Sequence, residues 1–276
     1  MPEDQGDQTP VGIDVSVPHP ARLYDYYLGG KDNFPADRAA AERVLDAAPE
    51  ARLMARENRR FLVRAARFLA AECGVRQFLD IGTGIPTSPN LHEIVQDVAP
   101  ASRIVYTDND RLVLAYARAL LTSTPDGVTA YLDADLRHVD RILSAPEVTE
   151  TLDFTRPVGL FLVAILHFIT DEENPGTIVK SLLDALPEGS YLVLSHATAD
   201  LRPTAAEDVV STYRSAAMAL TLRAKAEIAS FFDGTDLLDP GLVQVPTWRP
   251  TDELPPGHED VWIYGGVGHV ARQTVR

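Results

Sequence analysis

The feature that most constrains the fold is an alternation of short apolar runs with segments of helical periodicity. Strands that are apolar on both faces and separated by helices are typical of parallel βαβ units with right-handed crossovers. The sequence therefore predicts an α/β protein with a doubly wound, mostly parallel sheet. The runs expected to form its strands are 77–81, 103–107, 128–132, 158–166 and 191–195.

Two further β-rich runs, 241–246 and 261–271, follow a stretch of helical spacing at about 204–232. No convincing helix separates these two runs, so we expect an antiparallel hairpin at one edge that completes a seven-stranded sheet. Before the sheet, residues 37–73 have helical spacing, and Gly74 ends that pattern. Later helices are expected to begin at Ser88-Pro89, Asp110 and Asp171.

Charge and hydropathy narrow the possible partners. The net charge of −15 repels phosphate backbones and anionic lipids, and the Arg-rich stretch 52–69 is interpreted as a solvated helix face. No apolar run approaches the ~18 residues of a membrane span, and the acidic, proline-bearing tail at 1–20 lacks the features of a secretory signal. We expect a cytoplasmic protein that binds neither nucleic acid nor membrane, and the sequence leaves its oligomeric state open.

Metal and disulfide chemistry is not expected. The single cysteine, Cys73, excludes an internal disulfide framework and a cysteine-based zinc site. The sequence also has no compact group of His, Asp and Glu residues at the spacing of metal ligands. We therefore predict a site without a metal ion.

The loop 80-DIGTGIP-86 follows the first strand, and ligands of open parallel sheets bind beyond the carboxyl ends of the strands. Gly82 and Gly84 allow backbone torsions and a close approach that side chains forbid. A lone Gly-x-Gly is weak evidence, because a tight turn explains it equally well. We assign Asp80, Gly82, Thr83 and Gly84 to a candidate nucleotide site.

Acidic residues end the next two strands as well. Asp108 lies 108 − 80 = 28 residues after Asp80, near the ~20-residue separation expected for an acid that binds ribose hydroxyls. Asp133 and Asp135 end the third strand, where a carboxylate is able to accept a hydrogen bond from an adenine amine, and the backbone N–H of Leu136 could reach a ring nitrogen. Helix capping is the alternative for such residues, and for Asp110 it is the better interpretation.

Pro86 helps to choose the nucleotide. A dinucleotide fold binds pyrophosphate at the free N–H groups of a helix N-terminus and has a third glycine where this chain has proline, which lacks an N–H. The rim carries several carboxylates and no nearby Lys or Arg. This combination favours an adenosine whose tail carries a positive sulfonium, which describes S-adenosylmethionine.

The order of these features resembles the class I S-adenosylmethionine-dependent methyltransferases over roughly residues 75–270. Five motifs occur along the chain: 22-RLYDYYLGGKDNFPAD-37, 56-RENRRFL-62, 79-LDIGTGIPT-87, 106-YTDND-110 and 240-PGLVQVPTWRP-250. Together they resemble a bacterial family named S-adenosyl methyltransferase and first catalogued as a domain of unknown function, and this resemblance spans almost the whole chain. It does not supply an acceptor.

The resemblance implies a Rossmann-like methyltransferase domain at 75–276 and roles for single residues. Gly82 and Gly84 would line the cofactor, Asp80 would orient its methionine end, and Asp108 would hold the ribose. Asp135 would bind the adenine, with Asn109 packed against it. The missing third glycine departs from the broad class I pattern.

The segment 21–74 contains an aromatic helix that stops at Gly29-Gly30 and is interpreted as an N-terminal helical lid over the cofactor cleft. In this hypothesis Tyr27 and Asn33 reach the cofactor site, and Arg59 helps to fix the segment. A purely structural helix–turn–helix is the alternative. Gly-Gly-Lys does not form a phosphate loop, because Asp25 stands where that motif requires glycine.

His167 ends the fourth strand, where class I enzymes present the acceptor, and is a candidate general base because neutral imidazole accepts a proton near pH 7. A core or capping histidine is the alternative. The strand end lacks the Asp/Asn-Pro-Pro-aromatic motif that serves base or amide nitrogens, so we expect a small-molecule acceptor, methylated at oxygen. Two other functions stay open: a non-catalytic module that binds S-adenosylmethionine or S-adenosylhomocysteine, and an NAD(P)-dependent oxidoreductase.

Overall fold

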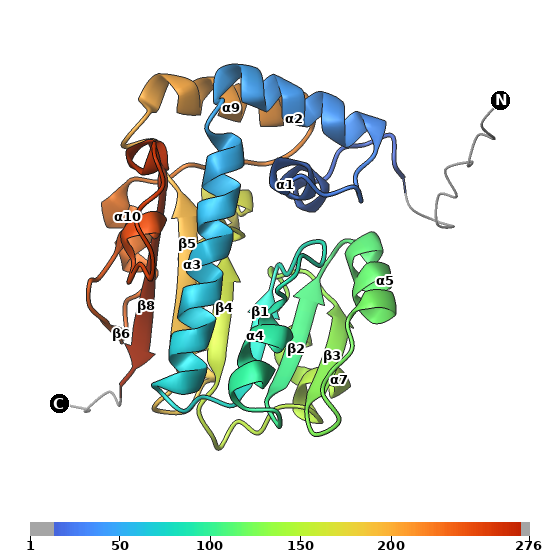
Figure 1. Cartoon of the computed structure of the whole chain (residues 1–276), viewed down its shortest axis with the longest axis vertical. Helices are drawn as coiled ribbons and strands as arrows, with labels where there is room; N and C mark the ends of the chain where they lie inside the picture. Colours follow the sequence, from blue (N-terminus) through green and yellow to red (C-terminus); the bar gives the residue numbers. More distant parts are fainter. Residues whose placement is uncertain (1–13, 272–276) are drawn as a thin grey trace.

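The five β-rich runs that precede residue 200 form the five parallel strands of one sheet in the computed structural model, which describes residues 14–271. The strand order is β3-β2-β1-β4-β5-β8-β6, and the direction of winding reverses between β1 and β4 (Figure 1). This arrangement confirms the predicted doubly wound sheet. The parallel strands are β1 (Gln77–Ile81), β2 (Arg103–Asp108), β3 (Val128–Asp133), β4 (Gly159–Val163) and β5 (Tyr191–Ala197).

The antiparallel edge is built around β8 (Ile263–Val270), which pairs with β5 along its whole length. The expected partner run at 241–246 contributes only the two-residue strand β7 (Val243–Gln244), which also pairs antiparallel with β8. A third short strand, β6 (Thr235–Leu237), gives the sheet eight strands instead of seven. Sequence reasoning missed β6 because three residues are too few to show a period.

Three helices precede the sheet: α1 (Pro20–Leu28), α2 (Pro35–Ala47) and α3 (Ala51–Ala71). Gly29 ends α1 in the left-handed region with a φ of 82°, as the Gly-Gly pair predicts. The single helical stretch expected at 37–73 is interrupted before α3, because Pro49 disfavours helical torsions at Ala48, whose φ and ψ are −140° and 80°.

The helices that follow the strands are α4 (Leu91–Val98), α5 (Arg111–Leu120), α6 (Val139–Ser144), α7 (Pro146–Thr149), α8 (Pro175–Asp184), α9 (Pro203–Ser215) and α10 (Lys225–Ser230). The expected helix at 204–232 is therefore two helices, and the chain leaves α9 through Ala217, whose φ is 56°. The left-handed torsion at Ala217 interrupts a stretch that the sequence predicted to be one continuous helix.

The predicted helix starts have mixed outcomes. Asp110 caps α5 as expected, since its Oδ1 atom accepts a hydrogen bond from the N–H of Leu112 at 2.8 Å. The start at Ser88-Pro89 was wrong, because α4 begins at Leu91 after Asn90, whose N–H donates to Glu93. The start at Asp171 was also wrong: Asp171 lies in a 3-10 turn ahead of α8, and its carboxylate binds Arg223 at 2.7 Å.

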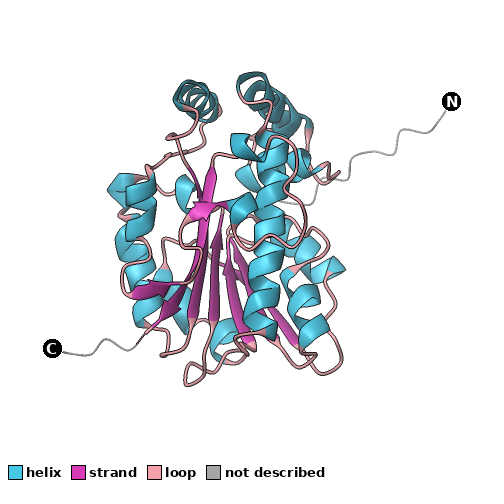
Figure 2. Ribbon diagram, turned by 60° about the vertical axis from the view of Figure 1, so that its left-hand side comes forward, coloured by secondary structure: helices cyan, strands magenta, loops and turns pink. Residues whose placement is uncertain are grey.

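The core lies on both faces of the sheet, as the doubly apolar strands require. Helices lie on both sides of the sheet (Figure 2). Neighbouring residues of β1 belong to different layers of the core: Phe78 lies in the layer with α3 and α4, whereas Leu79 lies in the layer with α6, α7, α8 and α10. Helices α1, α2 and α9 lie beyond the carboxyl ends of the strands (Figure 1). The carboxyl ends of the strands therefore face these three helices, which we call the helical roof.

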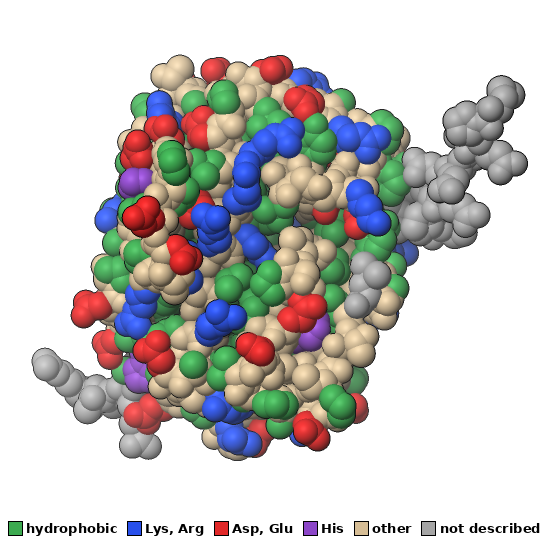
Figure 3. All heavy atoms as spheres, viewed as in Figure 1, with side chains coloured by type: hydrophobic (Ala, Val, Ile, Leu, Met, Phe, Trp, Pro, Cys, Tyr) green, Lys and Arg blue, Asp and Glu red, His purple; other side chains and the backbone are tan. Residues whose placement is uncertain are grey.

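The arginines of the Arg-rich helix α3 are divided between solvent and the fold. Arg56, Arg60 and Arg67 are exposed, as expected for a solvated face, whereas Arg64 donates to the carbonyl oxygens of Trp248 and Val245. On the face seen in Figure 3, Lys and Arg side chains lie among Asp and Glu side chains, without a continuous basic area in that view. Within residues 14–271, no helix has the length and apolar character needed to cross a membrane.

Candidate functional site

A cavity of about 460 Å³ lies at the switch point of the sheet, between the strand ends and the helical roof. Its size is within the range of ~300–1,000 Å³ typical of ligand pockets. The loop after β1 and the ends of β2, β3 and β4 form its floor, and α1, α2, α3, α9 and residues 217–222 contribute its walls and roof. The expected position of a ligand beyond the strand ends is therefore a real cavity.

The glycine loop has the geometry that the sequence predicted. Gly82 and Gly84 have φ values of 76° and 70°, in the left-handed region that favours glycine. A Cβ atom on Gly82 would lie 2.6 Å from the side chain of Ile165, so this position also needs a close approach. The N–H groups of Gly82 and Thr83 donate to the carbonyl oxygen of Thr107 at 2.8 and 3.2 Å, which fixes the loop against β2.

Asp108 connects the end of β2 to this loop. Its two carboxylate oxygens accept hydrogen bonds from the backbone N–H groups of Gly84, at 2.8 Å, and Asp110, at 2.9 Å. Burial raises the pKa of the Asp108 carboxyl, and these two hydrogen bonds act in the opposite direction. The acid is thus held rigidly at the rim of the cavity.

Asp80 is buried at the end of β1 and lines the same cavity. Its burial raises the pKa to about 7; the charge of Arg59 lowers it, and that of Asp108 raises it further. Arg59 reaches the cavity from α3 and donates to the carbonyl oxygens of Thr87 and Pro89, both at 2.5 Å. Its buried Nε atom has no hydrogen-bond partner among residues 14–271. Arg59 therefore holds the segment that follows the glycine loop, and none of its hydrogen bonds among residues 14–271 goes to α1 or α2.

Asp135 lies at the rim beyond β3 in a network of polar side chains. The Asn109 amide donates to Asp135 Oδ2 at 2.9 Å, and Arg137 Nη1 lies 2.9 Å from the same oxygen. Burial alone would raise the pKa of Asp135, but the hydrogen bonds from Arg137 and Asn109 lower it. The expectation of a rim without nearby Lys or Arg was wrong, because Arg137 follows Asp135 by two residues and Arg59 comes from a distant helix.

Of the remaining residues predicted for the rim, some line the cavity and one does not. Leu136 and Asn109 line the cavity. Asp133 does not line it, since the end of β3 directs its carboxylate toward Arg111, at 3.8 Å. β3 ends at Asp133, so Asp135 lies in the loop beyond the strand, where the chain turns toward the cavity.

The two residues predicted to reach the site from the N-terminal segment also differ. Tyr27 on α1 lines the cavity and is 7% exposed. Asn33 lies outside it, because its amide donates to Asp25 Oδ2 at 2.8 Å and to the Gly30 carbonyl oxygen at 3.0 Å. Asn33 thus closes the turn between α1 and α2 and does not contact the cavity.

His167 lines the cavity beside β4 and β5 but is poorly suited to accept a proton. Its Nδ1 atom lies 3.4 Å from the N–H of Ala197, as an acceptor, so the neutral ring carries its hydrogen on Nε2. Burial lowers the pKa of His167 well below its usual value, and the charge of nearby Arg223 adds to this. His167 is therefore a buried, neutral imidazole in the wall of the cavity.

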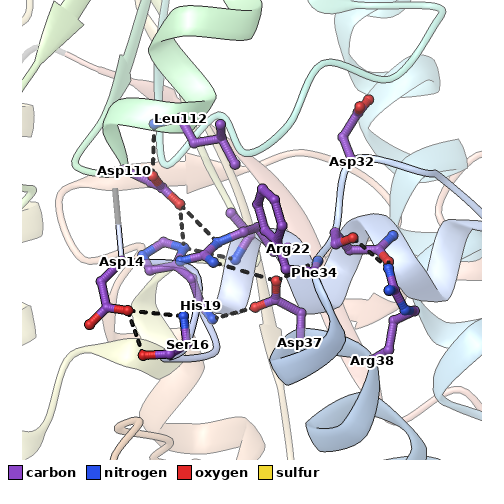
Figure 4. Close-up of polar contacts among 12 residues, drawn as sticks. Asp14, Ser16, His19, Arg22, Asp32, Phe34, Asp37, Arg38, Asp110 and Leu112 are labelled. Atoms are coloured by element: carbon purple, nitrogen blue, oxygen red, sulfur yellow. Dashed lines mark hydrogen bonds and ion pairs between the residues drawn. The ribbon is translucent and has the colours of Figure 1, made fainter. Parts of the chain in front are cut away.

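A group of charged residues that sequence reasoning missed joins the N-terminal segment to the end of β2 (Figure 4). Asp110 Oδ2 lies 3.2 Å from His19 Nδ1 and 3.4 Å from Arg22 Nε. Arg22 Nη1 also lies 3.4 Å from Asp37 Oδ2, and the N–H of His19 donates to Asp37 Oδ1 at 2.9 Å. We call His19, Arg22, Asp37 and Asp110 the latch. Of the contacts in the latch, the sequence hints only at the role of Asp37, because an acid three residues after Phe34 stands in the first turn of a helix.

The latch places part of the expected tail in the site. Val17, Pro18, His19 and Pro20 line the cavity, although residues 1–20 were expected to form a flexible tail. Residues 1–13 of that tail lie outside the described part of the chain. Within that described part, no group of three or more His, Cys, Asp or Glu residues is arranged to hold a metal ion.

Comparisons with known proteins identify relatives over the whole domain. The sequence profile of the S-adenosyl methyltransferase family matches residues 6–271. A DUF574 family protein from Streptomyces avermitilis is 48% identical, with a TM-score of 0.90 over 93% of this chain and 98% of that one. A putative methyltransferase from Thermobifida fusca is 37% identical, with a TM-score of 0.88 over 96% of this chain and 100% of that one.

More distant structures share the fold alone. A plantazolicin methyltransferase, solved with S-adenosylhomocysteine and a triazolic desmethyl analogue, is 11% identical with a TM-score of 0.50. The match covers 91% of this chain and 96% of that one. No curated protein sequence matches the chain significantly.

Proposed function

The chain belongs to the S-adenosyl methyltransferase family, its cofactor is S-adenosylmethionine, and we propose that it transfers the methyl group to a small molecule bound under α1, α2 and α9. The observation that carries this proposal is the continuity of the cavity. The same cavity is lined by the glycine loop and acidic rim at one end and by the helical roof at the other. No part of the protein would therefore separate a bound cofactor from a bound acceptor.

The charged groups in the cavity suit the amino-acid end of the cofactor. Asp80 is a buried carboxylate that forms no ion pair within residues 14–271, and a neighbouring ammonium group would stabilise its charged form. Arg59 offers a buried Nε atom that needs an acceptor, which a carboxylate would supply. We assign Asp80 to the ammonium group and Arg59 to the carboxylate of the methionine end.

The rim residues suit the adenosine. We assign Asp108 to the ribose hydroxyls, because its carboxylate lies beside the glycine loop and has lone pairs beyond the two that Gly84 and Asp110 use. Asp135, with Asn109 beside it, is assigned to the adenine amine, and the N–H of Leu136 to a ring nitrogen. Gly82, Thr83 and Gly84 would approach the cofactor through backbone. We propose these roles for the residues of this chain.

The absence of a helix directly after the glycine loop argues against a dinucleotide. The helix α4 begins only at Leu91, after Pro86 and Pro89, and Arg59 occupies the carbonyl groups of the connecting loop. The N-terminus of α4 is therefore not presented to a pyrophosphate at Gly84.

The proposed lid is the N-terminal segment itself. Residues 17–20 and Tyr27 cover the cavity, and the latch ties them to Asp110, two residues beyond the proposed ribose acid. Closing the segment over the cofactor would exclude water from the reacting groups. Asn33 supports the turn of this lid and does not reach the cofactor.

The chemistry of transfer makes modest demands on the protein. When bound, S-adenosylmethionine supplies an activated methyl group and leaves as a neutral thioether, so the chain has to orient the two molecules and keep the cavity dry. The end of β4 and the residues after it contribute Val163, Ile165 and His167 to the lining of the cavity. A small-molecule acceptor and a cytoplasmic location stay predictions.

Isothermal titration calorimetry with S-adenosylmethionine, S-adenosylhomocysteine and NAD tests the proposal. We expect the first two to bind and NAD not to bind. Asp108→Ala should weaken binding by about tenfold to a hundredfold, the worth of hydrogen bonds to a charged group, whereas the control Asp133→Ala should bind normally, because Asp133 lies outside the cavity. Binding of NAD alone would overturn the assignment, and binding without turnover on any acceptor of a small-molecule library would favour a non-catalytic module.

A further inference from the structure

The Asp, Arg and His side chains that line the cavity are not spread evenly over it. Apart from His167 they are His19, Arg59, Asp80, Asp108, Asp135 and Arg137, which belong to the strand ends, the latch or the wall beside the glycine loop. We call the part beneath the roof, lined by Tyr24, Tyr27, Met54, Asn58, Tyr213 and Met218, the acceptor chamber. Among the described residues, the lining that α1, α2, α9 and residues 217–222 contribute contains no Asp, Glu, Lys or Arg side chain. A charged molecule would lose its hydration there without gaining a partner.

The chamber surface is aromatic and adaptable. Tyr213 stacks on Phe168, with ring centroids 6.1 Å apart and an angle of 26° between the planes, and Phe168 in turn contacts His167 edge to face at 4.4 Å. Met54 and Met218 add flexible thioethers to the lining. Flat rings pack well on such a surface, because aromatic pairs and sulfur–aromatic contacts are favourable.

Most polar side chains of the chamber are already paired with protein groups. The Asn58 amide donates to the Tyr24 hydroxyl at 2.9 Å, and that hydroxyl donates to the Ala55 carbonyl oxygen at 3.0 Å. The Ser195 hydroxyl donates to Asn58 Oδ1 at 2.6 Å, which completes this network. Trp262 donates its ring N–H to Glu50 at 2.9 Å. These groups hold the walls of the chamber and are not free to select a ligand.

The Tyr27 hydroxyl differs from these groups. It is buried and has no hydrogen-bond partner of normal geometry within residues 14–271, although the Tyr213 hydroxyl lies near enough to interact with it as a hydrogen-bonding neighbour. Burial raises the pKa of Tyr27 far above its usual value and that of Tyr213 to about 12. Tyr27 thus stays protonated at neutral pH and offers a hydrogen. A buried hydroxyl without a partner destabilises the cavity, and an oxygen atom of a ligand that accepts its hydrogen would remove that cost.

We propose that the acceptor is an uncharged, predominantly aromatic molecule and that Tyr27 selects it by donating a hydrogen bond to one of its oxygen atoms. This inference rests on the proposed function, because it names the class of molecule that the chamber binds beside the cofactor. Tyr27 is then a specificity-determining residue for the acceptor, instead of the cofactor contact that the sequence suggested.

Equilibrium dialysis of protein saturated with S-adenosylhomocysteine tests the proposal with three probes of one ring system: 2-naphthol, 2-naphthoate and naphthalene. We expect 2-naphthol to bind at least about tenfold more tightly than 2-naphthoate, since the anion would be buried without a partner. Tyr27→Phe should weaken 2-naphthol about fivefold, the worth of one neutral hydrogen bond, and leave naphthalene unchanged. Tyr26→Phe is the matched control, because Tyr26 lies on the same helix and does not line the cavity.

Two results would overturn the proposal. One is equal affinity for 2-naphthol and 2-naphthoate, or no binding of 2-naphthol to protein that binds S-adenosylhomocysteine. The other is a Tyr27→Phe variant that binds 2-naphthol as tightly as the unmodified protein. Failure of S-adenosylhomocysteine itself to bind, measured beforehand by calorimetry, would instead refute the proposed function.

Discussion

Arg22, on the first helix, lies with its Nε atom 3.4 Å from Oδ2 of Asp110, two residues beyond the Asp108 carboxylate that binds the glycine loop. This contact joins a segment that lies 110 − 22 = 88 residues earlier in the sequence to the rim assigned to the ribose. Arg22 and Asp110 are both almost fully buried, so the contact is little screened by solvent. Cofactor binding and closure of the N-terminal segment should therefore be coupled.

Removing Arg22 tests this coupling. Arg22→Leu leaves Asp37 and Asp110 buried without their guanidinium partner, and breaking a buried pair in this way costs ~3–5 kcal/mol of the free energy of unfolding. We expect faster amide hydrogen exchange in α1 and weaker binding of S-adenosylhomocysteine. Arg43→Leu is a suitable control, because Arg43 is exposed and donates only within its own helix. Unchanged exchange in α1 would show that the latch does not hold the segment.

Asp80 should make the stability of the protein depend on pH. Its folded-state pKa of about 7 lies above the ordinary value of 3.8, so the native state binds the proton more tightly than the unfolded state. The free energy of unfolding should then fall as pH rises from about 4 to 7, by up to about 4 kcal/mol at 1.36 kcal/mol per pKa unit. Asp80→Asn removes the titrating group and with it this pH dependence. In urea unfolding, we expect the variant to be more stable than the unmodified protein at pH 8 and to have nearly the same free energy of unfolding at pH 4. A constant difference at both pH values would contradict the assignment.

The sequence predicted the parts of the fold and site that depend on local pattern. The strands β1, β2, β3 and β5, the turn at Gly29 and the acids Asp80, Asp108 and Asp135 follow from hydrophobic runs, glycine torsions and strand ends. All of these signals lie within a few residues of the feature that they predict.

The parts that the sequence did not predict depend on contacts between distant segments. The charge of Arg59 acts on Asp80 only because α3 packs across the sheet, against β4, β5 and β8, and the latch needs α1 to lie against the end of β2. The interruption at Ala217 and the two-residue strand β7 arise from tertiary packing, which overrides weak local preference. A single sequence contains no period or motif for such contacts.

The glycine loop should not tolerate a side chain at Gly82. Gly82→Ala would place a Cβ atom 2.6 Å from Ile165 at a φ of 76°, so we expect a loss of roughly 2 kcal/mol or more in the free energy of unfolding. Cofactor affinity should fall with it, because the loop and Ile165 line the same cavity. The control is Gly176→Ala in α8, where a Cβ atom meets nothing within 4 Å. Equal thermal denaturation curves for both variants would contradict the close approach at Gly82.

His167 should prove dispensable as a base. A general base contributes ~10²–10⁴-fold to turnover, but the buried ring of His167 has a pKa far below its usual value and already uses Nδ1 as an acceptor. Once an acceptor is known, we expect His167→Gln to keep turnover within about tenfold, because glutamine is neutral, as the buried imidazole is. A loss of a hundredfold or more in kcat, with cofactor affinity unchanged, would restore His167 as the general base.

Arg59 and Asp80 should discriminate ligands by their amino-acid end. S-adenosylhomocysteine carries both an ammonium and a carboxylate group, whereas 5′-methylthioadenosine carries neither. We expect Arg59→Gln and Asp80→Asn each to weaken S-adenosylhomocysteine about tenfold or more in calorimetry, the worth of a hydrogen bond between charged groups, and to change 5′-methylthioadenosine by less than about twofold. Because Arg59 also binds the carbonyl groups of Thr87 and Pro89, its replacement could loosen the loop for both ligands. An equal loss for the two ligands in Arg59→Gln, with a selective loss in Asp80→Asn, would mean that Arg59 acts only through the loop and that Asp80 alone binds the methionine end.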